Sequence, residues 1–361
     1  MTAESRTGPR VTVLMSVFNA RRYVARAIES ILSQAFDGFE FVIINDGSTD
    51  GSEEVIRSYT DPRIRIISQA NRGLAASLNR GILTSHADYV ARMDADDAAH
   101  PARLAKQIRF LDEHPEYALV GSAVDVIEPG GRSKFIMRHP TWDLCIRWHI
   151  LFDSPFVHSS VVYRRDAVTA AGLYDEEGAA HVEDYELWSR IASRYKVANL
   201  REPLLRYLDN PEGVSHSRRD QQERNSLAVS ARNIGALLGE PFPAERARGL
   251  RSVRLGQGAK LGIREILEAT RDLDAVCAAF EAKHADELGS RPRIRHAIRH
   301  EVARAELAGS YFAWKLGGRD LSLRTAKRAV LRGPIALPEL LCRRAIRSIA
   351  QLKRRPHRLQ R

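Results

Sequence analysis

Short apolar runs alternate with segments of helical periodicity along the first part of the chain. The runs are typical of buried strands and predict strands at residues 11–17, 39–44, 64–67 and 88–93. The segments between and after them predict helices at 23–32, 52–59, 74–83 and 101–110. Because strands that alternate with helices form right-handed βαβ units, we expect an α/β fold, with a mostly parallel, Rossmann-like sheet flanked by helices.

The pattern changes after residue 117. Strands are predicted at 118–127 and 133–137, around the turn signal Pro129-Gly130-Gly131, and again at 157–163, before a helix at 183–194. After about residue 220 the sequence is helical and rich in Arg and Ala, with breaks at Gly and Pro. We therefore predict an α/β domain over 1–220, a helical accessory region over 221–333 and a basic tail over 334–361.

Composition places the chain among ordinary globular proteins, with 361 residues of which 44% are hydrophobic and 28% charged. Three widely separated cysteines, Cys145, Cys277 and Cys342, predict neither a disulfide framework nor a metal site. The first ten residues lack the apolar core of a signal peptide, and no run reaches the roughly 18 apolar residues of a spanning helix. We expect a cytoplasmic protein.

The net charge of +11 is concentrated near the end of the chain. Residues 341–361 contain eight Lys or Arg and no Asp or Glu, with apolar residues between them. An amphipathic basic helix of this kind can lie on an anionic lipid surface, which would make the protein peripheral to the inner face of the membrane. A solvated tail, or one packed on the helical region, is an equally good interpretation.

Carboxylates follow two of the predicted strands. Asp46 comes after the strand at 39–44, and Asp94 and Asp96 come after the strand at 88–93. Ligands of open α/β sheets bind beyond the carboxyl ends of the strands, so these side chains are candidates for a binding site. Two carboxylates at this spacing can bind one divalent cation, Mg²⁺ or Mn²⁺, which can in turn hold a diphosphate. The alternative is a solvated acidic loop.

Four motifs occur in the order seen in glycosyltransferase family 2, which the chain resembles over about residues 11–215. They are the run 11–19, Asn45-Asp46-Gly47-Ser48-Thr49-Asp50, Arg92-Met93-Asp94-Ala95-Asp96-Asp97 and Glu183-Asp184-Tyr185-Glu186-Leu187-Trp188. The resemblance implies a GT-A fold and an inverting enzyme that uses a nucleotide-diphospho-sugar.

The resemblance also implies a donor site. Asp46 is expected to contact the nucleotide base, and the residues expected to line the base and ribose pocket are Val17, Phe18 and Asn19. Asp94 and Asp96 form the DXD signature that holds the metal and the donor diphosphate. The adjoining Asp97 is expected either to cap the next turn or to support these ligands. For Asp46 the alternative is a turn cap.

Arg72 precedes the helix at 74–83, where free N–H groups favour an anion. In similar enzymes this segment borders the donor, so Arg72 is expected to bind it. The alternative is a solvated arginine beside a cap by Asn71.

For the acceptor side, the resemblance places the catalytic base at Asp184, with Glu183 as its supporting acid. Both acids also suit a helix N-terminus, where negative charge complements the dipole. His158 and Trp188 are assigned to the acceptor side, against the alternatives of a structural histidine and a packed core residue.

The third metal ligand departs from the family pattern. Many relatives have a Tyr-Arg pair and then a histidine downstream of the base; here Leu208 replaces the arginine and Asn210 stands in place of that histidine. Asp209 and His216 are the candidates to replace it.

We therefore expect an inverting, metal-dependent glycosyltransferase with a saccharide or lipid-linked acceptor. The alternative is a basic membrane- or nucleic-acid-binding protein with an inactive GT-A-like domain. Nucleic acid is not expected as a partner, because carboxylates in a cleft would repel phosphate.

Overall fold

The computed structural model describes residues 8–211, 213, 217–257, 261–316 and 326. The chain divides into two compact units, Met1–Val229 and Ser230–Arg361, and helix α9 (Arg219–Leu238) crosses the boundary. The basic tail predicted over 334–361 lies outside the described residues, and the domain limits predicted at 220 and 333 stay predictions.

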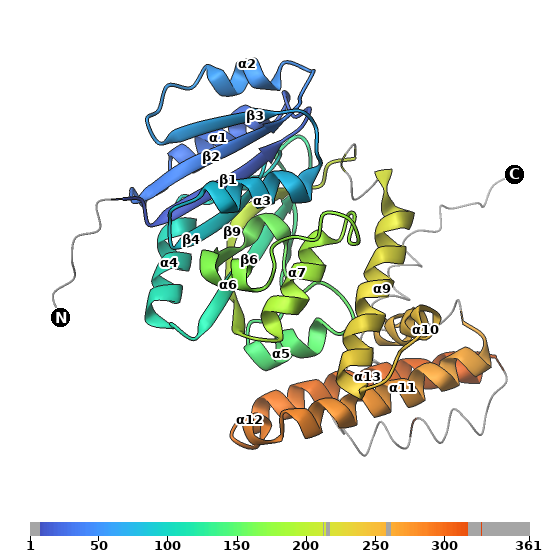
Figure 1. Cartoon of the computed structure of the whole chain (residues 1–361). Helices are drawn as coiled ribbons and strands as arrows, with labels where there is room; N and C mark the ends of the chain where they lie inside the picture. Colours follow the sequence, from blue (N-terminus) through green and yellow to red (C-terminus); the bar gives the residue numbers. More distant parts are fainter. Residues whose placement is uncertain (1–7, 212, 214–216, 258–260, 317–325, 327–361) are drawn as a thin grey trace, which may run out of the picture. The chain divides into compact units, whose positions relative to one another are not determined.

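One nine-stranded mixed sheet forms the centre of the unit Met1–Val229 (Figure 1). Its strands follow the order β3-β2-β1-β4-β8-β6-β9-β5, and β7 pairs with β6. The strands are β1 (Val11–Val17), β2 (Phe39–Asp46), β3 (Ile64–Gln69), β4 (Tyr89–Asp94), β5 (Ala98–Ala99), β6 (Tyr117–Ile127), β7 (Ser133–Met137), β8 (Val162–Arg164) and β9 (Lys196–Leu208).

The first four strands are parallel, as the sequence predicts. β1 lies between β2 and β4, with Val17 opposite Asn45 and Ser16 opposite Asp94. The carboxyl ends of these neighbouring strands therefore reach the same edge of the sheet. The later strands make the whole sheet mixed: β8 is antiparallel to both β4 and β6, whereas β6 and β9 are parallel.

Helices cover both faces of this sheet. They are α1 (Val24–Leu32), α2 (Ser52–Arg57), α3 (Leu74–Thr84), α4 (Arg103–Glu113), α5 (Asp143–His149), α6 (Arg165–Ala170) and α7 (Glu183–Ala192). Alternate side chains of a strand point to opposite faces. Accordingly, Met15 belongs to one buried cluster with Ile28 of α1, and Leu14 belongs to another with Leu78 of α3 and Leu187 of α7.

Close contact between α3 and β1 depends on Gly81. A Cβ atom at this position would lie 2.1 Å from Cδ1 of the buried Leu14, so a larger residue would push the helix away from the strand. Helix α3 follows the loop at residues 70–73, which we call the donor-side loop because the family resemblance places it beside the donor. By allowing α3 to pack closely on β1, Gly81 also affects the distance of this loop from the sheet.

The unit differs from the predicted elements in several places: α5, α6 and the two-residue strand β5 were not predicted, and two further strands differ. The strand predicted at 157–163 is wrong in its first half: His158–Ser160 form a 3₁₀ turn, η1, and β8 begins only at Val162. Strand β9 was missed because Asn199, Arg201 and Pro203 interrupt its apolar pattern. Its pairing with β6 shifts register around these residues, so contacts with the neighbouring strand stabilise what local propensity does not predict.

The unit that begins at Ser230 is helical in its described part. Its helices after α9 are α10 (Ala244–Arg254), α11 (Ile263–Lys283), α12 (Ala285–Gly289) and α13 (Pro292–Lys315). Ion pairs join them, including Arg246–Asp272 between α10 and α11, and Arg254–Glu301 between α10 and α13. In the described parts of both units, no helix is long and apolar enough to cross a membrane.

Candidate active site

Three aspartates crowd the carboxyl end of β4. Asp94 ends the strand and forms an ion pair with Arg92, whose side chain is only 1% exposed. Asp96 accepts a hydrogen bond from Nδ2 of Asn210 at 3.2 Å, and its backbone carbonyl accepts one from Arg26 at 2.6 Å. Asn210 follows β9, so the loops after β4 and β9 meet here.

The environment of Asp96 and Asp97 opposes their ionisation. Burial and the nearby charge of Asp94 raise the pKa of Asp96. The same two causes, together with Asp96, hold the pKa of Asp97 well above its ordinary value. The Asp97 carboxylate accepts hydrogen bonds from Ser159 and from the backbone N–H of Leu208, so it joins η1 to the end of β9. This contact agrees with a supporting role.

Asp94 and Asp96 suit a hard divalent cation. They offer carboxylate oxygens at one strand end, and their mutual repulsion would be relieved by added positive charge. Within the described ranges, no three His, Cys, Asp or Glu side chains gather in a way that could hold a metal. If an ion binds here, Asp94 and Asp96 would offer it two carboxylates, and a cation such as Mg²⁺ can take further ligands from water and substrate phosphate.

Of the two predicted replacements for the third ligand, the structure describes only Asp209. Asp209 forms an ion pair with Lys134 at 2.5 Å, and His216 lies outside the described residues. Asn210 does lie beside Asp96, but it donates to the carboxylate through its amide nitrogen.

Asp46 organises the loop that precedes α3. Its side chain is 2% exposed, and its two oxygens accept hydrogen bonds from the backbone N–H groups of Arg72 and Gly73, both at 2.9 Å, and from Gln69 at 2.7 Å. Gly47 follows with φ of +75°, and a Cβ there would lie 2.7 Å from the backbone nitrogen of Asn71. Asp46 therefore holds the loop before α3 and does not cap the turn that follows it, and its base contact stays a prediction.

The three residues at the carboxyl end of β1, Val17, Phe18 and Asn19, differ in exposure. Val17 is 0% exposed and its side chain belongs to the core, and its place in the nucleotide pocket stays a prediction. Phe18, by contrast, is 52% exposed. Asn19 has φ of +50°, and its Oδ1 accepts a hydrogen bond from the backbone of Thr49, joining the loops after β1 and β2.

Glu183 and Asp184 form the first turn of α7, where both are half-buried. Burial, followed by the charge of Glu183, raises the pKa of Asp184 to about 7, while the charge of Arg92 opposes the rise. Burial also raises the pKa of Glu183. A carboxyl group with a pKa near 7 is suited to accept a proton at neutral pH.

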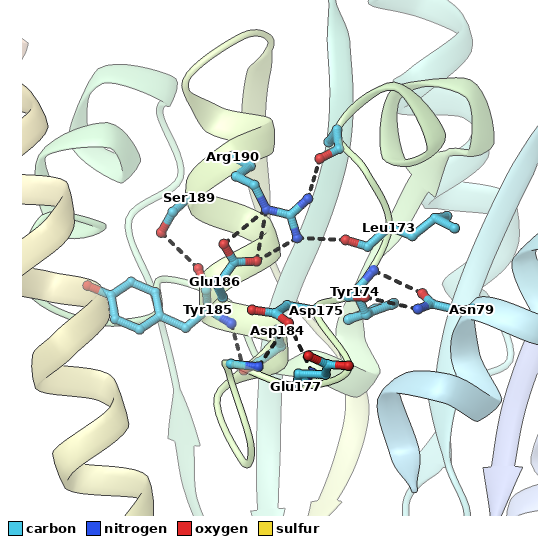
Figure 2. A network of polar contacts seen from close by, with 12 residues as sticks. Asn79, Leu173, Tyr174, Asp175, Glu177, Asp184, Tyr185, Glu186, Ser189 and Arg190 are labelled. Atoms are coloured by element: carbon cyan, nitrogen blue, oxygen red, sulfur yellow. Dashed lines mark hydrogen bonds and ion pairs between the residues drawn. The ribbon is translucent and has the colours of Figure 1, made fainter. Parts of the chain in front are cut away.

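The segment between α6 and α7 is held by side chains that the sequence did not reveal as site residues (Figure 2). Asn79 of α3 accepts a hydrogen bond from the backbone N–H of Tyr174 and donates to its carbonyl, both at 2.9 Å. Arg190 of α7 pairs with Glu186 and donates to the carbonyls of Ala171 and Leu173. The i,i+4 spacing of Glu186 and Arg190 is the sequence signal for this pair.

Arg72 and Glu176 connect this segment to the donor-side loop. Glu176 accepts a hydrogen bond from Asn79 at 2.9 Å, and its other oxygen lies 3.9 Å from Nη2 of Arg72. Arg72 is 65% exposed, so it is free to reorient toward a bound anion.

The two residues assigned to the acceptor side lie in an aromatic cluster. Trp188 is 0% exposed and packs against Phe156, His158, Tyr163 and Tyr174, with ring centroids about 6 Å apart. The ring is packed as in the core alternative, and the acceptor-side role of Trp188 stays a prediction. His158 hydrogen-bonds Tyr174 at 3.0 Å, and burial holds its pKa well below its ordinary value, as for a neutral structural histidine. Its acceptor role stays a prediction.

A cavity of about 460 Å³ lies away from these residues, beside the start of β4 and β6. It is lined by Tyr89, Tyr117 and Arg164 among others, and contains none of the predicted site residues. Arg164 donates hydrogen bonds to the carbonyls of Tyr117 and Leu111, so its guanidinium has a structural role.

Known proteins share this sequence pattern. The family model described as "Glycosyl transferase family 2" matches residues 12–168. The amylovoran biosynthesis glycosyltransferase AmsE of Erwinia amylovora is 32% identical over 213 residues, which cover 57% of this chain and 79% of that protein. The O-antigen biosynthesis glycosyltransferase WbnJ of Escherichia coli is 30% identical over 203 residues, which cover 55% of this chain and 78% of that protein.

Among solved structures, residues 1–349 of S. aureus TarS in complex with UDP-GlcNAc align with a TM-score of 0.55 at 16% identity. The alignment covers 90% of this chain and 92% of that one, which supports the GT-A type of fold. Fold, strand-end carboxylates and relatives agree: the chain belongs to glycosyltransferase family 2 and is a glycosyltransferase.

Proposed function

We propose that the protein transfers a sugar, with inversion, from a nucleotide-diphospho-sugar to an acceptor hydroxyl. One observation carries the proposal: Asp94, at the end of β4, and Asp184, at the start of α7, belong to one electrostatically coupled cluster around Arg92. Residues 90 positions apart in the sequence thus supply a donor-side carboxylate and a base to one site.

The donor would bind at the shared edge of β1, β2 and β4. Phe18 offers an exposed ring for the nucleotide, and Arg72 offers a mobile cation for the diphosphate. Asp46 holds the loop that contains Arg72 and is proposed to contact the nucleotide base. TarS, which shares the fold, was solved with UDP-GlcNAc, and this supports a nucleotide-sugar donor here.

Asp94 and Asp96 would hold a divalent cation, Mg²⁺ or Mn²⁺. When bound, such an ion neutralises charge on the leaving diphosphate and orients its oxygens.

Asp184 would act as the base. Its Oδ1 accepts a hydrogen bond from the backbone N–H of Tyr185 at 2.7 Å, so we assign the acceptor proton to Oδ2. The acceptor oxygen attacks the anomeric carbon from the face opposite the diphosphate, its O–H proton passes to Asp184, and the glycosidic bond electrons leave with the diphosphate. One displacement inverts the configuration at that carbon.

The acceptor would be a saccharide or a lipid-linked saccharide. AmsE and WbnJ are named for the biosynthesis of amylovoran and O-antigen, which supports a polysaccharide setting. A cytoplasmic enzyme that works at the inner face of the membrane would meet such an acceptor where it is assembled.

A two-step experiment tests this function. Thermal shift with UDP-, GDP- and dTDP-sugars, with and without Mn²⁺, identifies the donor; NMR of the product then reads the anomeric configuration. We expect ion-dependent stabilisation by one nucleotide class and an inverted product. Asp96→Ala should abolish both, whereas Asp166→Asn, at an exposed carboxylate on α6, should change neither. A retained configuration, or full activity of Asp96→Ala, would contradict the proposal.

A further inference from the structure

A row of three polar side chains runs along helix α1. Arg26 and Ser30 lie four residues apart on the helix, and Gln34 follows after four more, just beyond its end. Residues at this spacing share one face of a helix. Gln34 is only 5% exposed, and Arg26 and Ser30 are half-buried, so the row is not a solvated helix surface. We therefore expect it to be paired with polar groups elsewhere in the protein.

The partners of this row are backbone groups of residues 96–104, which lead from the end of β4 into the first turn of α4. Nη2 of Arg26 donates a hydrogen bond to the carbonyl of Asp96 at 2.6 Å. Oγ of Ser30 accepts a hydrogen bond from the N–H of Ala99 at 3.0 Å. The contacts follow the same order along both segments, so α1 and the chain after β4 lie side by side.

Gln34 completes the row with two hydrogen bonds. Its Nε2 donates to the carbonyl of His100 at 2.9 Å, and its Oε1 accepts from the N–H of Leu104 at 3.0 Å. The same segment also pairs with β9, because Ala99 lies opposite Leu205. The chain after β4 is thus held by α1 and by β9.

The bond from Arg26 differs from the others because it reaches the turn that carries a candidate metal ligand. It holds the peptide group between Asp96 and Asp97. Because a peptide group is planar, holding its carbonyl restricts the ψ angle of Asp96, and with it the direction in which the Asp96 carboxylate leaves the chain. The next side chain, Asp97, is held separately by Ser159 and by the N–H of Leu208. The turn is therefore fixed at two consecutive residues.

We propose that Arg26 is a positioning residue of the candidate metal site: by holding the Asp96 carbonyl, its guanidinium keeps the Asp96 carboxylate in one orientation before an ion binds. The inference rests on the proposed function, in which Asp94 and Asp96 hold a divalent cation. A carboxylate that is already oriented binds an ion more tightly, because less of the turn has to be ordered on binding.

The test measures Mn²⁺ binding to the protein alone, by the loss of the electron paramagnetic resonance signal of free Mn²⁺. The part of the binding that Asp96→Ala removes defines the site. We expect the dissociation constant of this site to rise about tenfold in Arg26→Met, which keeps the apolar stem and removes the donor. Arg26→Lys keeps a cationic donor and should recover most of the loss.

Arg165→Met is the matched control. Arg165 of α6 is also half-buried, and its Nη1 donates to the carbonyl of Ser85, ahead of β4, at 3.0 Å. Among the described residues, Nε has no hydrogen-bond partner in either arginine, and it is buried in both. Arg165 also lies 3.6 Å from the exposed Asp166, a contact worth little in water. Both Met variants should unfold at lower urea concentration than the wild type, but only Arg26→Met should bind Mn²⁺ more weakly.

Wild-type Mn²⁺ affinity in Arg26→Met would overturn the proposal, as would an equal weakening in Arg165→Met. If Arg26→Met does not fold, Arg26→Gln decides, because its amide is shorter by two bonds and cannot reach the same carbonyl. Unchanged Mn²⁺ affinity in that variant would refute the positioning role. Failure of the proposed metal site looks different, because the wild type would then bind Mn²⁺ no better than Asp96→Ala.

Discussion

The carboxylates of the site have the same chemistry but different surroundings. Asp46 accepts hydrogen bonds from two backbone N–H groups and holds the loop that precedes α3. Asp97 accepts hydrogen bonds from Ser159 and from the backbone N–H of Leu208, and it thereby joins η1 to the end of β9. Asp184 accepts one backbone N–H group through Oδ1 and lies half-buried next to Glu183. Of these three, Asp184 is therefore the carboxylate best placed to exchange a proton.

Replacing Asp184 with Asn tests that role at constant size. Because the amide cannot accept the acceptor proton, we expect transfer to fall by about 10²–10⁴-fold while donor affinity stays within about twofold. Calorimetry with the nucleotide and a transfer assay measure the two effects separately. Loss of donor binding together with transfer would move Asp184 from the base position to the donor site.

The wild-type activity should also depend on pH with a defined sign. A base whose pKa is about 7 loses activity as the pH falls below that value, since its carboxylate becomes protonated.

Single-residue assignments were only partly predictable from the sequence. The strand-end aspartates and the acidic pair before α7 carry motif signals, and the structure brings Asp94 and Asp184 together. The burial of Val17 and Trp188 has a signal too, because Val17 ends a run typical of a buried strand and a packed core residue is one interpretation of Trp188. The pattern does not show whether either residue borders a ligand. Arg92 lies within a motif, but its partner is visible only in three dimensions.

At the scale of elements, the segment between α6 and α7 connects the two halves of the site. Asn79 holds Tyr174 from α3, and Arg190 holds Ala171 and Leu173 from α7. The segment leads directly into the first turn of α7. Its position therefore fixes the position of Asp184, the proposed base, relative to helix α3.

Asn79→Asp tests this connection with a nearly isosteric change. The carboxylate can still accept from the backbone of Tyr174, but it cannot donate to that carbonyl and it repels Glu176. Because the site is buried, we expect a loss of about 1–3 kcal/mol in the free energy of unfolding, together with a lower kcat. Urea denaturation and steady-state kinetics measure both.

Asn225→Asp is the matched control for this change. Asn225 donates to the carbonyl of Ala180 in the same segment at 2.7 Å; the residue is half-buried, but this hydrogen bond is exposed, so water can replace it. A loss as large in this control as in Asn79→Asp would show that the bond to Tyr174 has no special importance.

The sequence predicted elements best where periodicity is strong. Strands β1 to β4 have continuous apolar runs, so their type and parallel order follow from local pattern. Helix α5 has no comparable signal and was missed. The 3₁₀ turn η1 was mistaken for a strand because apolar residues flank it, Val157 before it and Val161 to Tyr163 after it. Its shape is decided by the hydrogen bond from the backbone N–H of Ser160 to the carbonyl of Val157.

At the scale of the whole molecule, the charge is unevenly distributed. Residues 317–361 hold 13 of the 56 Lys and Arg residues and 2 of the 45 Asp and Glu residues. This part alone accounts for the net charge of +11, so residues 1–316 are neutral overall. An anionic surface would therefore attract the chain through this part of its sequence.

Deleting residues 341–361 tests whether that attraction is to lipid. The deletion removes eight basic residues and no acid, so binding to vesicles that contain phosphatidylserine should weaken by at least about tenfold at low salt. Co-sedimentation measures the binding, with neutral vesicles as the control. Equal binding of the full and shortened chains would reject the membrane role, and unchanged donor turnover would show that the fold is intact.

The most direct test of the central claim is the binding of the donor nucleotide and Mn²⁺ measured by calorimetry, each in the presence and absence of the other. If separate acids converge on one cation-bridged donor, each ligand should tighten the other by at least about tenfold, and Asp96→Ala should remove this coupling. Nucleotide binding of the same strength with and without the ion, in the wild type, would contradict the account.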